Sequence, residues 1–304
     1  MAIMAFNRRG LAILGSWAIL GSWANGRRMA LGLLTVAAVA VVAVVLMGTG
    51  TAFATEPQNW QLGFQEAGSP VKERMHSFHN MLLVIIITIA IFVMLLLAYV
   101  TIRFRAKANP VPSRVSHNTL IEVIWTVAPV LILVVIAVPS FRLLYFEDRA
   151  ANAEMTVKVV GHQWYWSYEY PDNGNFQFDS YMIQDADLKP GQKRLLDVDN
   201  RLVLPVGTTV RVLIAGTDVI HSFMVPSLGL QTYSMPGRLN ETWVKIDHPG
   251  VYYGQCNQIC GTNHAYMPIA IEGVSKEAFK AWVEEAKKKY ASDAPATSLA
   301  AAAR

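Results

Sequence analysis

Residues 256–267 read Cys-Asn-Gln-Ile-Cys-Gly-Thr-Asn-His-Ala-Tyr-Met and contain both cysteines of this chain. Cys256, Cys260 and His264 follow one another at equal spacing, and Met267 closes the run. Thiolate, imidazole and thioether groups form a soft ligand set, which favours copper. A tetrahedral zinc site would more usually recruit further cysteines or histidines and would not need the methionine. Because one thiolate is enough for a single copper ion, two thiolates suggest two copper ions bridged by both sulfurs.

One further histidine, His221, lies upstream of this loop in the sequence Asp-Val-Ile-His-Ser-Phe. An early histidine followed by a late loop with cysteine, histidine and methionine is the ligand order of cupredoxins. The alternative is a disulfide between Cys256 and Cys260, since two cysteines in an exported domain often pair. The flanking His264 and Met267, together with His221, favour metal over the disulfide.

The composition points to membrane segments. Hydrophobic residues make up 53% of the 304 residues and the mean hydropathy is positive, which is high for a soluble protein. Residues 145–304 hold 15 basic and 18 acidic residues, so the net charge of +4 arises from the first 144 residues. The basic residues flank apolar runs, where they set membrane topology, and no basic run suggests binding to nucleic acid.

Residues 1–54 have the organisation of a signal peptide. Arginines near the start precede an uncharged apolar stretch over residues 31–47, and Ala52-Phe-Ala54 has the small-x-small pattern of a cleavage site. Cleavage would start the mature chain near Thr55. An uncleaved membrane anchor is the alternative.

Two uncharged runs, residues 81–102 and 123–141, are long enough to cross a bilayer. They predict a transmembrane hairpin within residues 55–150, with helices at about 81–102 and 121–143. A buried hairpin of a soluble protein is the alternative. Residues 103–114, between the runs, carry four basic residues and no acid. The positive-inside rule therefore places this loop in the cytoplasm and both ends of the mature chain outside.

Glu122 lies at the entrance of the second membrane segment. Thr119-Leu-Ile-Glu122 fits a capping box, in which the glutamate side chain reaches back to the N-cap backbone. An ionisable group at that depth can also admit protons from the cytoplasm. The residues alone leave both roles open.

The pattern changes to β structure from about Met155. Short β-rich runs bounded by Gly, Pro, Asn and Asp follow at residues 176–183, 201–204, 208–214, 241–246 and 250–254. Several short strands with turn signals predict an all-β sandwich or barrel, which we place at residues 151–274. Residues 275–304 are predicted to form an amphipathic helix, to about Tyr290, and then a disordered tail.

Several motifs between Gln61 and Trp282 are specific in combination. They are Gln61-Leu-Gly-Phe-Gln, Glu122-Val-Ile-Trp-Thr, Gly161-His-Gln-Trp-Tyr-Trp-Ser-Tyr-Glu-Tyr, Asp218-Val-Ile-His-Ser-Phe, Pro236-Gly-Arg-Leu-Asn, Tyr252-Tyr-Gly-Gln-Cys and residues 256–267. On these motifs the chain resembles subunit II of the haem-copper cytochrome c oxidases. The resemblance implies a two-helix membrane hairpin joined to an exported cupredoxin-like domain, a Greek-key β-sandwich or barrel.

The resemblance also implies a function. Proteins of this family accept electrons from cytochrome c at a binuclear copper A centre and pass them to haem in subunit I. There, oxygen is reduced to water and protons are pumped. The implied partners are cytochrome c, subunit I and subunit III. The implied location is a bacterial inner membrane, with the copper domain on the periplasmic side.

Carried over by position, the copper ligands of the family match the residues singled out above. The resulting set is Cys256 and Cys260 as bridges, His221 and Met267 on one ion, His264 on the other, and the main-chain carbonyl of Gln258. The family usually has a glutamate at position 258, whose carboxylate helps to bind magnesium or manganese at the subunit I interface. Because an amide lacks that charge, we expect weak magnesium binding here, while the carbonyl ligand to copper persists.

Three more roles follow from the resemblance. Trp164 matches the family tryptophan that accepts electrons from cytochrome c, and Tyr165 lies beside it; filling of a β core is the alternative for such aromatics. Glu122 matches a glutamate at the cytoplasmic entry of a proton pathway into subunit I. Acidic residues of the exported domain are expected to attract a basic cytochrome c, the candidates being Glu169, Asp172, Asp197, Asp199 and Asp218.

Three other protein classes share parts of this sequence pattern. The subunit II of quinol oxidases has the same fold but lacks the copper ligands. Nitrous oxide reductase shares the copper loop, but it lacks the membrane hairpin and needs a large catalytic domain for which this chain has no room. The third is a membrane-anchored β domain with a Cys256–Cys260 disulfide, serving adhesion or copper delivery.

Overall fold

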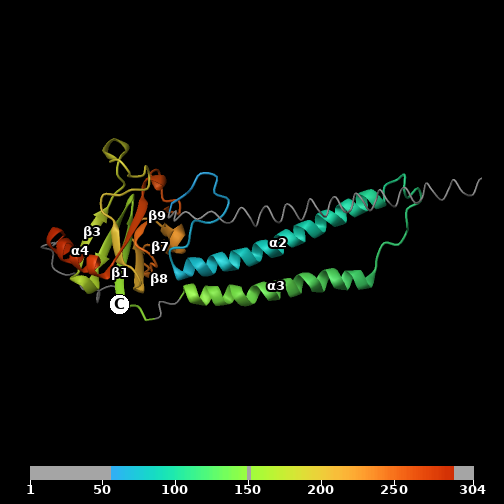
Figure 1. Cartoon of the computed structure of the whole chain (residues 1–304), viewed down its shortest axis with the longest axis horizontal. Helices are drawn as coiled ribbons and strands as arrows, with labels where there is room; N and C mark the ends of the chain where they lie inside the picture. The colour runs from blue at the N-terminus through green and yellow to red at the C-terminus, as the bar shows by residue number, and fades with distance from the viewer. Residues whose placement is uncertain (1–55, 149–151, 291–304) are drawn as a thin grey trace, which may run out of the picture.

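The computed structural model describes residues 56–148 and 152–290. The predicted signal peptide and the predicted disordered tail lie outside the described residues. Two long helices project from a β domain that carries a third, shorter helix (Figure 1). The predicted fold class, a membrane hairpin joined to a cupredoxin-like β-sandwich, is confirmed.

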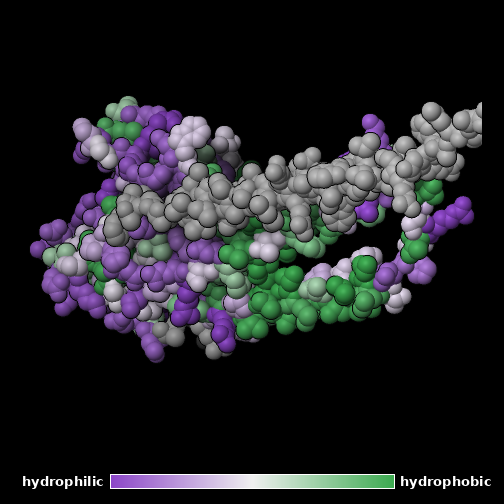
Figure 2. Space-filling model, turned by 45° about the vertical axis from the view of Figure 1, so that its right-hand side comes forward, coloured by the Kyte–Doolittle hydropathy of each residue, from purple (hydrophilic) through white to green (hydrophobic). Residues whose placement is uncertain are grey.

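The two long helices form the hairpin. Helix α2 spans Pro70–Arg103 and helix α3 spans Thr119–Glu147, and the two lie alongside each other (Figure 1). Both are long and apolar enough to cross a membrane, and their apolar side chains cover the outside of the hairpin in Figure 2. At 1.5 Å per residue the 34 residues of α2 reach about 51 Å, more than the roughly 30 Å of a bilayer core.

Helix α2 therefore extends well outside the apolar run at residues 81–102. It begins at Pro70 because the hydroxyl of Ser69 caps it, accepting a hydrogen bond from the backbone nitrogen of Lys72. The same Ser69 hydroxyl donates to the carbonyl of Leu228 in the β domain at 2.7 Å. The other helix is tied to the domain at its end, where Trp243 Nε1 donates to the carbonyl of Phe146 at 3.1 Å.

Within residues 152–290, ten strands form two five-stranded sheets. The first sheet has the order β3 (Phe176–Ser180), β2 (Tyr165–Tyr170), β1 (Met155–His162), β5 (Val210–Gly216) and β8 (Asn240–Val244). The second has the order β4 (Leu202–Pro205), β10 (Pro268–Val274), β9 (Gly250–Cys256), β6 (His221–Val225) and β7 (Leu230–Ser234). Pairing is antiparallel except between β1 and β5 and between β4 and β10.

The core lies between the two sheets. Strand β1 alternates buried and half-buried residues along its whole length, which places Val157 and Val159 inside. Trp166 from the first sheet packs edge-to-face on Phe223 from the second, with 5.1 Å between ring centroids, and both side chains are fully buried. Burying a side chain of this size stabilises the fold by about 1.5–3 kcal/mol. The sandwich is therefore a rigid support for the loops at its ends.

Helix α4 (Lys276–Lys289) packs against one end of this core. Ser275 caps it, and its buried Phe279, Val283 and Ala286 recur at helical spacing. Trp282 of α4 packs against the rings of Tyr170 and Phe178.

Candidate metal centre

Three strand ends meet at one end of the sandwich and position the candidate ligands. Strand β6 begins at His221, β9 ends at Cys256, and β10 begins directly after Met267. The antiparallel pairing of β6 with β9 and of β9 with β10 brings these ends together. The loop between β9 and β10 contains Cys260 and the short helix η4 (His264–Tyr266).

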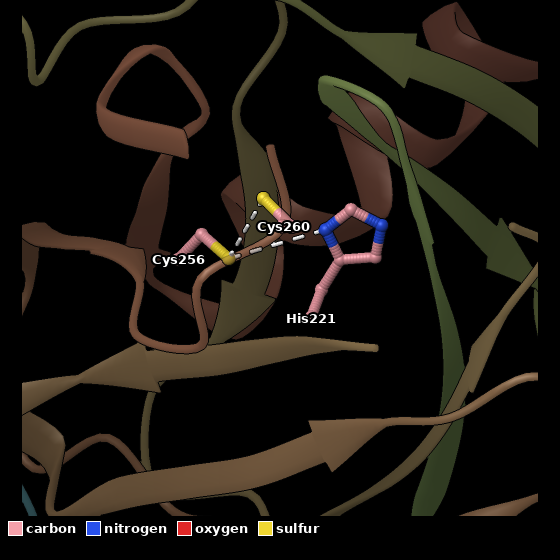
Figure 3. A group of neighbouring side chains, drawn as sticks. All are labelled: His221, Cys256 and Cys260. Atoms are coloured by element: carbon pink, nitrogen blue, oxygen red, sulfur yellow. Dashed lines mark hydrogen bonds between the residues drawn. The ribbon is translucent and has the colours of Figure 1, made fainter. Parts of the chain in front are cut away.

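Cys260 lies at the centre of the group. Its Sγ is 3.5 Å from Nδ1 of His264 and 3.6 Å from Sδ of Met267. The Sγ atoms of Cys260 and Cys256 are 3.9 Å apart, and Nδ1 of His221 is 4.0 Å from Cys256 Sγ. Figure 3 shows the side chains of His221, Cys256 and Cys260 directed at one another. The two sulfurs thus stand between two imidazoles, and the sequence prediction that these five residues meet agrees with this geometry.

Both cysteines are free thiols in the structure. Two sulfurs bound to one tetrahedral ion with bonds of about 2.3 Å would lie about 3.8 Å apart. The 3.9 Å between the cysteine sulfurs is close to this spacing. Within the described ranges, His221, Cys256 and Cys260 have ligand atoms that all lie within 4.8 Å of one another. The donor set and its spacing therefore fit copper ions bridged by thiolates.

Water is largely excluded from this site. The exposed fractions are 0% for His221, 6% for Cys256, 4% for Cys260 and 1% for Met267. Burial raises the pKa of the Cys260 thiol, and the neighbouring Cys256 raises it further. Burial also acts to raise the pKa of Cys256, but hydrogen bonds, the largest from His221, outweigh it and lower that pKa to about 7. One thiol is thus close to ionisation at neutral pH, and the thiolate is the form that binds metal.

Neighbouring groups orient two of the candidate ligands. Asp218 Oδ1 accepts a hydrogen bond from His221 Nε2 at 2.8 Å, which leaves Nδ1 facing Cys256. Carboxylates commonly fix the tautomer of a metal-binding histidine in this way. Trp166 Nε1 donates to the carbonyl of Met267 at 3.4 Å.

Gln258 lies next to the sulfurs through its main chain. Its carbonyl oxygen is 3.3 Å from Sγ of Cys256, and the residue is half-buried. The position of this carbonyl agrees with a ligand role for the backbone. No hydrogen bond of the Gln258 side chain is recorded among the described residues, so the structure leaves its magnesium role a prediction.

Trp164 and Tyr165 differ in their relation to the site. Trp164 Nε1 donates to the carbonyl of Cys260 at 3.3 Å, so the indole touches the cysteine loop. Tyr165 instead stacks between His162 and Tyr181, with ring centroids 4.4 and 4.5 Å away. The geometry therefore favours Trp164 over Tyr165 as the group in contact with the metal centre.

Glu122 lies far from this group, at the end of the hairpin away from the β domain (Figure 1). Its carboxylate accepts a hydrogen bond from the backbone nitrogen of Asn118 at 3.3 Å. The N-cap is Asn118, whose side chain accepts from the nitrogen of Ile121, and not Thr119 as the sequence pattern predicted. The capping role survives this correction, because Glu122 still reaches back to the N-cap backbone.

Sequence reasoning missed two residues that position the site, Trp166 and Gln163. The alternation of aromatic and polar residues from Trp166 to Tyr170 could have indicated that Trp166 is buried, but not that its nitrogen meets Met267. Gln163 donates from its side chain to the carbonyl of Cys260 at 2.8 Å, across 97 positions of sequence. No local pattern signals such a contact. Asp218 was expected at a docking surface; it is exposed, and its carboxylate also bonds to His221, a contact that sequence reasoning did not anticipate.

Comparisons with known proteins identify the family. The model of the family "Cytochrome C oxidase subunit II, transmembrane domain" matches residues 57–143, and that of the corresponding periplasmic domain matches residues 155–274. A probable cytochrome c oxidase subunit 2 from Rickettsia bellii is 56% identical over 249 residues, covering 82% of this chain and 92% of the relative. Cytochrome c oxidase subunit 2 from Mycosarcoma maydis is 48% identical, covering 78% of this chain and 96% of the relative.

A solved structure also matches. The periplasmic domain of subunit II of cytochrome oxidase from Bradyrhizobium japonicum is 52% identical, covers 47% of this chain and 99% of that chain, and superposes with a TM-score of 0.44. The two family matches cover the membrane hairpin and nearly the whole β domain, and the curated relatives match along most of their own length. The chain is a membrane protein with an extramembrane domain and belongs to the cytochrome c oxidase subunit II family, whose members are subunits of an oxidoreductase complex.

Proposed function

We propose that this chain is the electron-entry subunit of a cytochrome c oxidase. In this role it accepts electrons from cytochrome c at a binuclear copper A centre and passes them to haem in subunit I, where oxygen is reduced to water with proton pumping. The observation that carries the proposal is the meeting of two free thiols, two imidazoles and a thioether at one buried end of the sandwich.

The residues would hold two copper ions as follows. Cys256 and Cys260 would hold both ions, His221 and Met267 would hold one, His264 would hold the other, and the carbonyl of Gln258 would complete the set. The spacing supports the assignment of the two histidines to different ions, because His221 lies next to Cys256 and His264 lies next to Cys260.

Copper bound by these residues would supply the one-electron redox change, and a site that keeps its ligands in place would let that change occur with little rearrangement. The protein contributes rigidity. Strand pairing fixes His221 and Cys256, Asp218 fixes the imidazole of His221, and Trp166 fixes the backbone at Met267. The five side chains occupy the site and leave it suited to relaying electrons rather than to binding a substrate.

Trp164 is the proposed point of electron entry. Its indole nitrogen bonds to the carbonyl of Cys260, which gives a short covalent and hydrogen-bonded route from the ring to the bridging sulfur. The ring is half-buried, so one side remains accessible to a partner. Tyr165 lies next to it in sequence, and its stack with His162 and Tyr181 forms a neighbouring part of the same surface.

The acidic candidates for docking cytochrome c are all bonded within the domain. Asp197 is buried and pairs with Arg201, and Glu169 pairs with Lys158. The other three are exposed although their carboxylates accept hydrogen bonds; they are Asp172, Asp199 and Asp218. Because these three lie at the surface, they are the ones we propose to attract a basic partner.

The remaining parts of the proposal rest on the family. Subunits I and III are the proposed membrane partners, and the proposed location is a bacterial inner membrane with the β domain in the periplasm. Glu122 is proposed as a proton entry point in addition to its capping role. Magnesium binding near Gln258 is proposed to be weak, because a neutral amide replaces a carboxylate.

The test is metal analysis with EPR spectroscopy on the purified oxidase complex. We expect two copper ions in this subunit and the spectrum of a delocalised mixed-valence pair. A complex without copper in this subunit, with Cys256 and Cys260 joined as a disulfide, would contradict the proposal.

A further inference from the structure

Gln163 forms hydrogen bonds that connect it both to His221, through Asp218, and to Cys260. It lies in the turn between β1 and β2, at the same end of the sandwich as the cysteine loop. Its side-chain amide donates to the carbonyl of Cys260 at 2.8 Å. Its backbone nitrogen donates to Asp218 Oδ2 at 2.6 Å, and the other oxygen of Asp218 accepts from His221. Gln163 thus connects to His221 through its backbone and Asp218, and to Cys260 through its side chain.

The contact with the cysteine loop depends on a close approach. Gly261, which follows Cys260, has a φ of +123°, a region that favours glycine. A Cβ at this position would lie 3.1 Å from Nε2 of Gln163 and 3.0 Å from the ring of Trp164. The loop is therefore shaped to let Gln163 and Trp164 reach the same carbonyl, that of Cys260.

The carbonyl that Gln163 and Trp164 hold belongs to Cys260, whose sulfur lies at the centre of the site. Cys260 Sγ lies 3.5 Å from Nδ1 of His264 and 3.6 Å from Sδ of Met267, and it also faces Cys256. Fixing its carbonyl fixes the rotation of the Cys260 backbone and so the direction of its side chain. The amide also points the positive end of its dipole toward the loop. An N–H dipole directed toward a redox centre favours the more negative, reduced state of that centre and so raises its reduction potential.

We propose that Gln163 is a positioning residue that holds Cys260 in its bridging orientation and raises the reduction potential of the centre. The inference rests on the proposed copper function. The Gln163 side chain is exposed, so replacing it leaves no cavity in the core. The backbone bond to Asp218 remains in every side-chain variant, which isolates the contribution of the amide.

The experiment compares three variants of the full chain in the assembled oxidase. Gln163→Met has nearly the same shape and no donor, whereas Gln163→Lys keeps an N–H donor. Gln192→Glu is the matched control, because Gln192 bonds only to the loop backbone at Lys189. In Gln163→Met we expect copper to be released to a soluble chelator about five times faster, the factor for a hydrogen bond of about 1 kcal/mol. We also expect a lower midpoint potential in a redox titration of the EPR signal.

Gln163→Lys and Gln192→Glu should release copper at the rate of the unaltered complex. A third readout does not need copper. In copper-depleted complex the loosened loop of Gln163→Met should expose its thiols, which should react with a maleimide about five times faster than in the control. Equal thiol reactivity, or equal copper release and potential in Gln163→Met and Gln192→Glu, would overturn the inference. If the unaltered complex held no copper, the proposed function would fail and thiol reactivity would still decide this inference.

Discussion

Replacing Asp218 by asparagine should weaken copper binding without disturbing the fold. The carboxylate accepts a hydrogen bond from His221 Nε2 at 2.8 Å and from two backbone nitrogens, those of Gln163 and Val219, at 2.6 Å each. An asparagine of the same shape has only one acceptor oxygen, so at least one donor faces an NH₂ group. Hydrogen bonds to charged groups contribute about 1.5–3 kcal/mol, and we take the lower end because the Asp218 side chain is 32% exposed.

The expected loss in copper affinity follows from the tautomer of His221. Once the Nε2 partner is weakened, Nδ1 is no longer held toward Cys256, and second-shell changes of this kind typically cost 10–100-fold in metal affinity. The assay is competition with a copper chelator, followed by EPR of the purified complex. The control is Asp172→Asn, which removes the same charge from an exposed aspartate that accepts from the backbone of Thr156 at 2.7 Å. Equal copper retention in Asp218→Asn and Asp172→Asn would refute the reasoning.

Four further outcomes are expected. Trp164→Phe should slow reduction by cytochrome c at least tenfold in stopped-flow experiments while the copper content stays unchanged; an unchanged rate would remove Trp164 from the entry route. Turnover with a basic cytochrome c should fall as ionic strength rises above an optimum, because salt screens charge attraction, and a rate indifferent to salt would contradict the docking proposal. Glu122→Gln should lower steady-state turnover, whereas unchanged turnover would leave only the helix cap. Gln258→Glu should raise magnesium retention in metal analysis of the complex, and one tightly held magnesium in the unaltered complex would defeat the expected weak binding.

The sequence predicts the centre of the site better than its surroundings. The spacing of Cys256, Cys260 and His264 and the position of His221 anticipate side chains that the structure places in a row, with 4.0 Å or less between successive ligand atoms. Such prediction is possible because each candidate ligand lies at the end of a strand or in one short loop. The bonds from Gln163 and Trp166 to this loop depend on how two sheets face each other, and no local pattern contains that information.

The helix boundaries also depend partly on local sequence, which can be predicted, and partly on tertiary contacts, which cannot. The uncharged run at residues 81–102 marks the apolar part of α2, since hydropathy reports contact with lipid. The helix begins at Pro70, where Ser69 both caps it and bonds to Leu228 in the β domain. At the start of α3 the side chain of Asn118 takes the N-cap position in place of Thr119, although both residues are good N-caps. Tertiary contacts and local backbone geometry decide between such neighbours.

The central claim is that Cys256 and Cys260 bridge two copper ions, and EPR spectroscopy with copper analysis of the purified oxidase tests it most directly. The account predicts two coppers in this subunit with a delocalised mixed-valence spectrum, and loss of that spectrum in Cys260→Ser. A complex whose subunit II holds no copper, or one whose EPR spectrum shows isolated copper ions unaffected by Cys260→Ser, would contradict it.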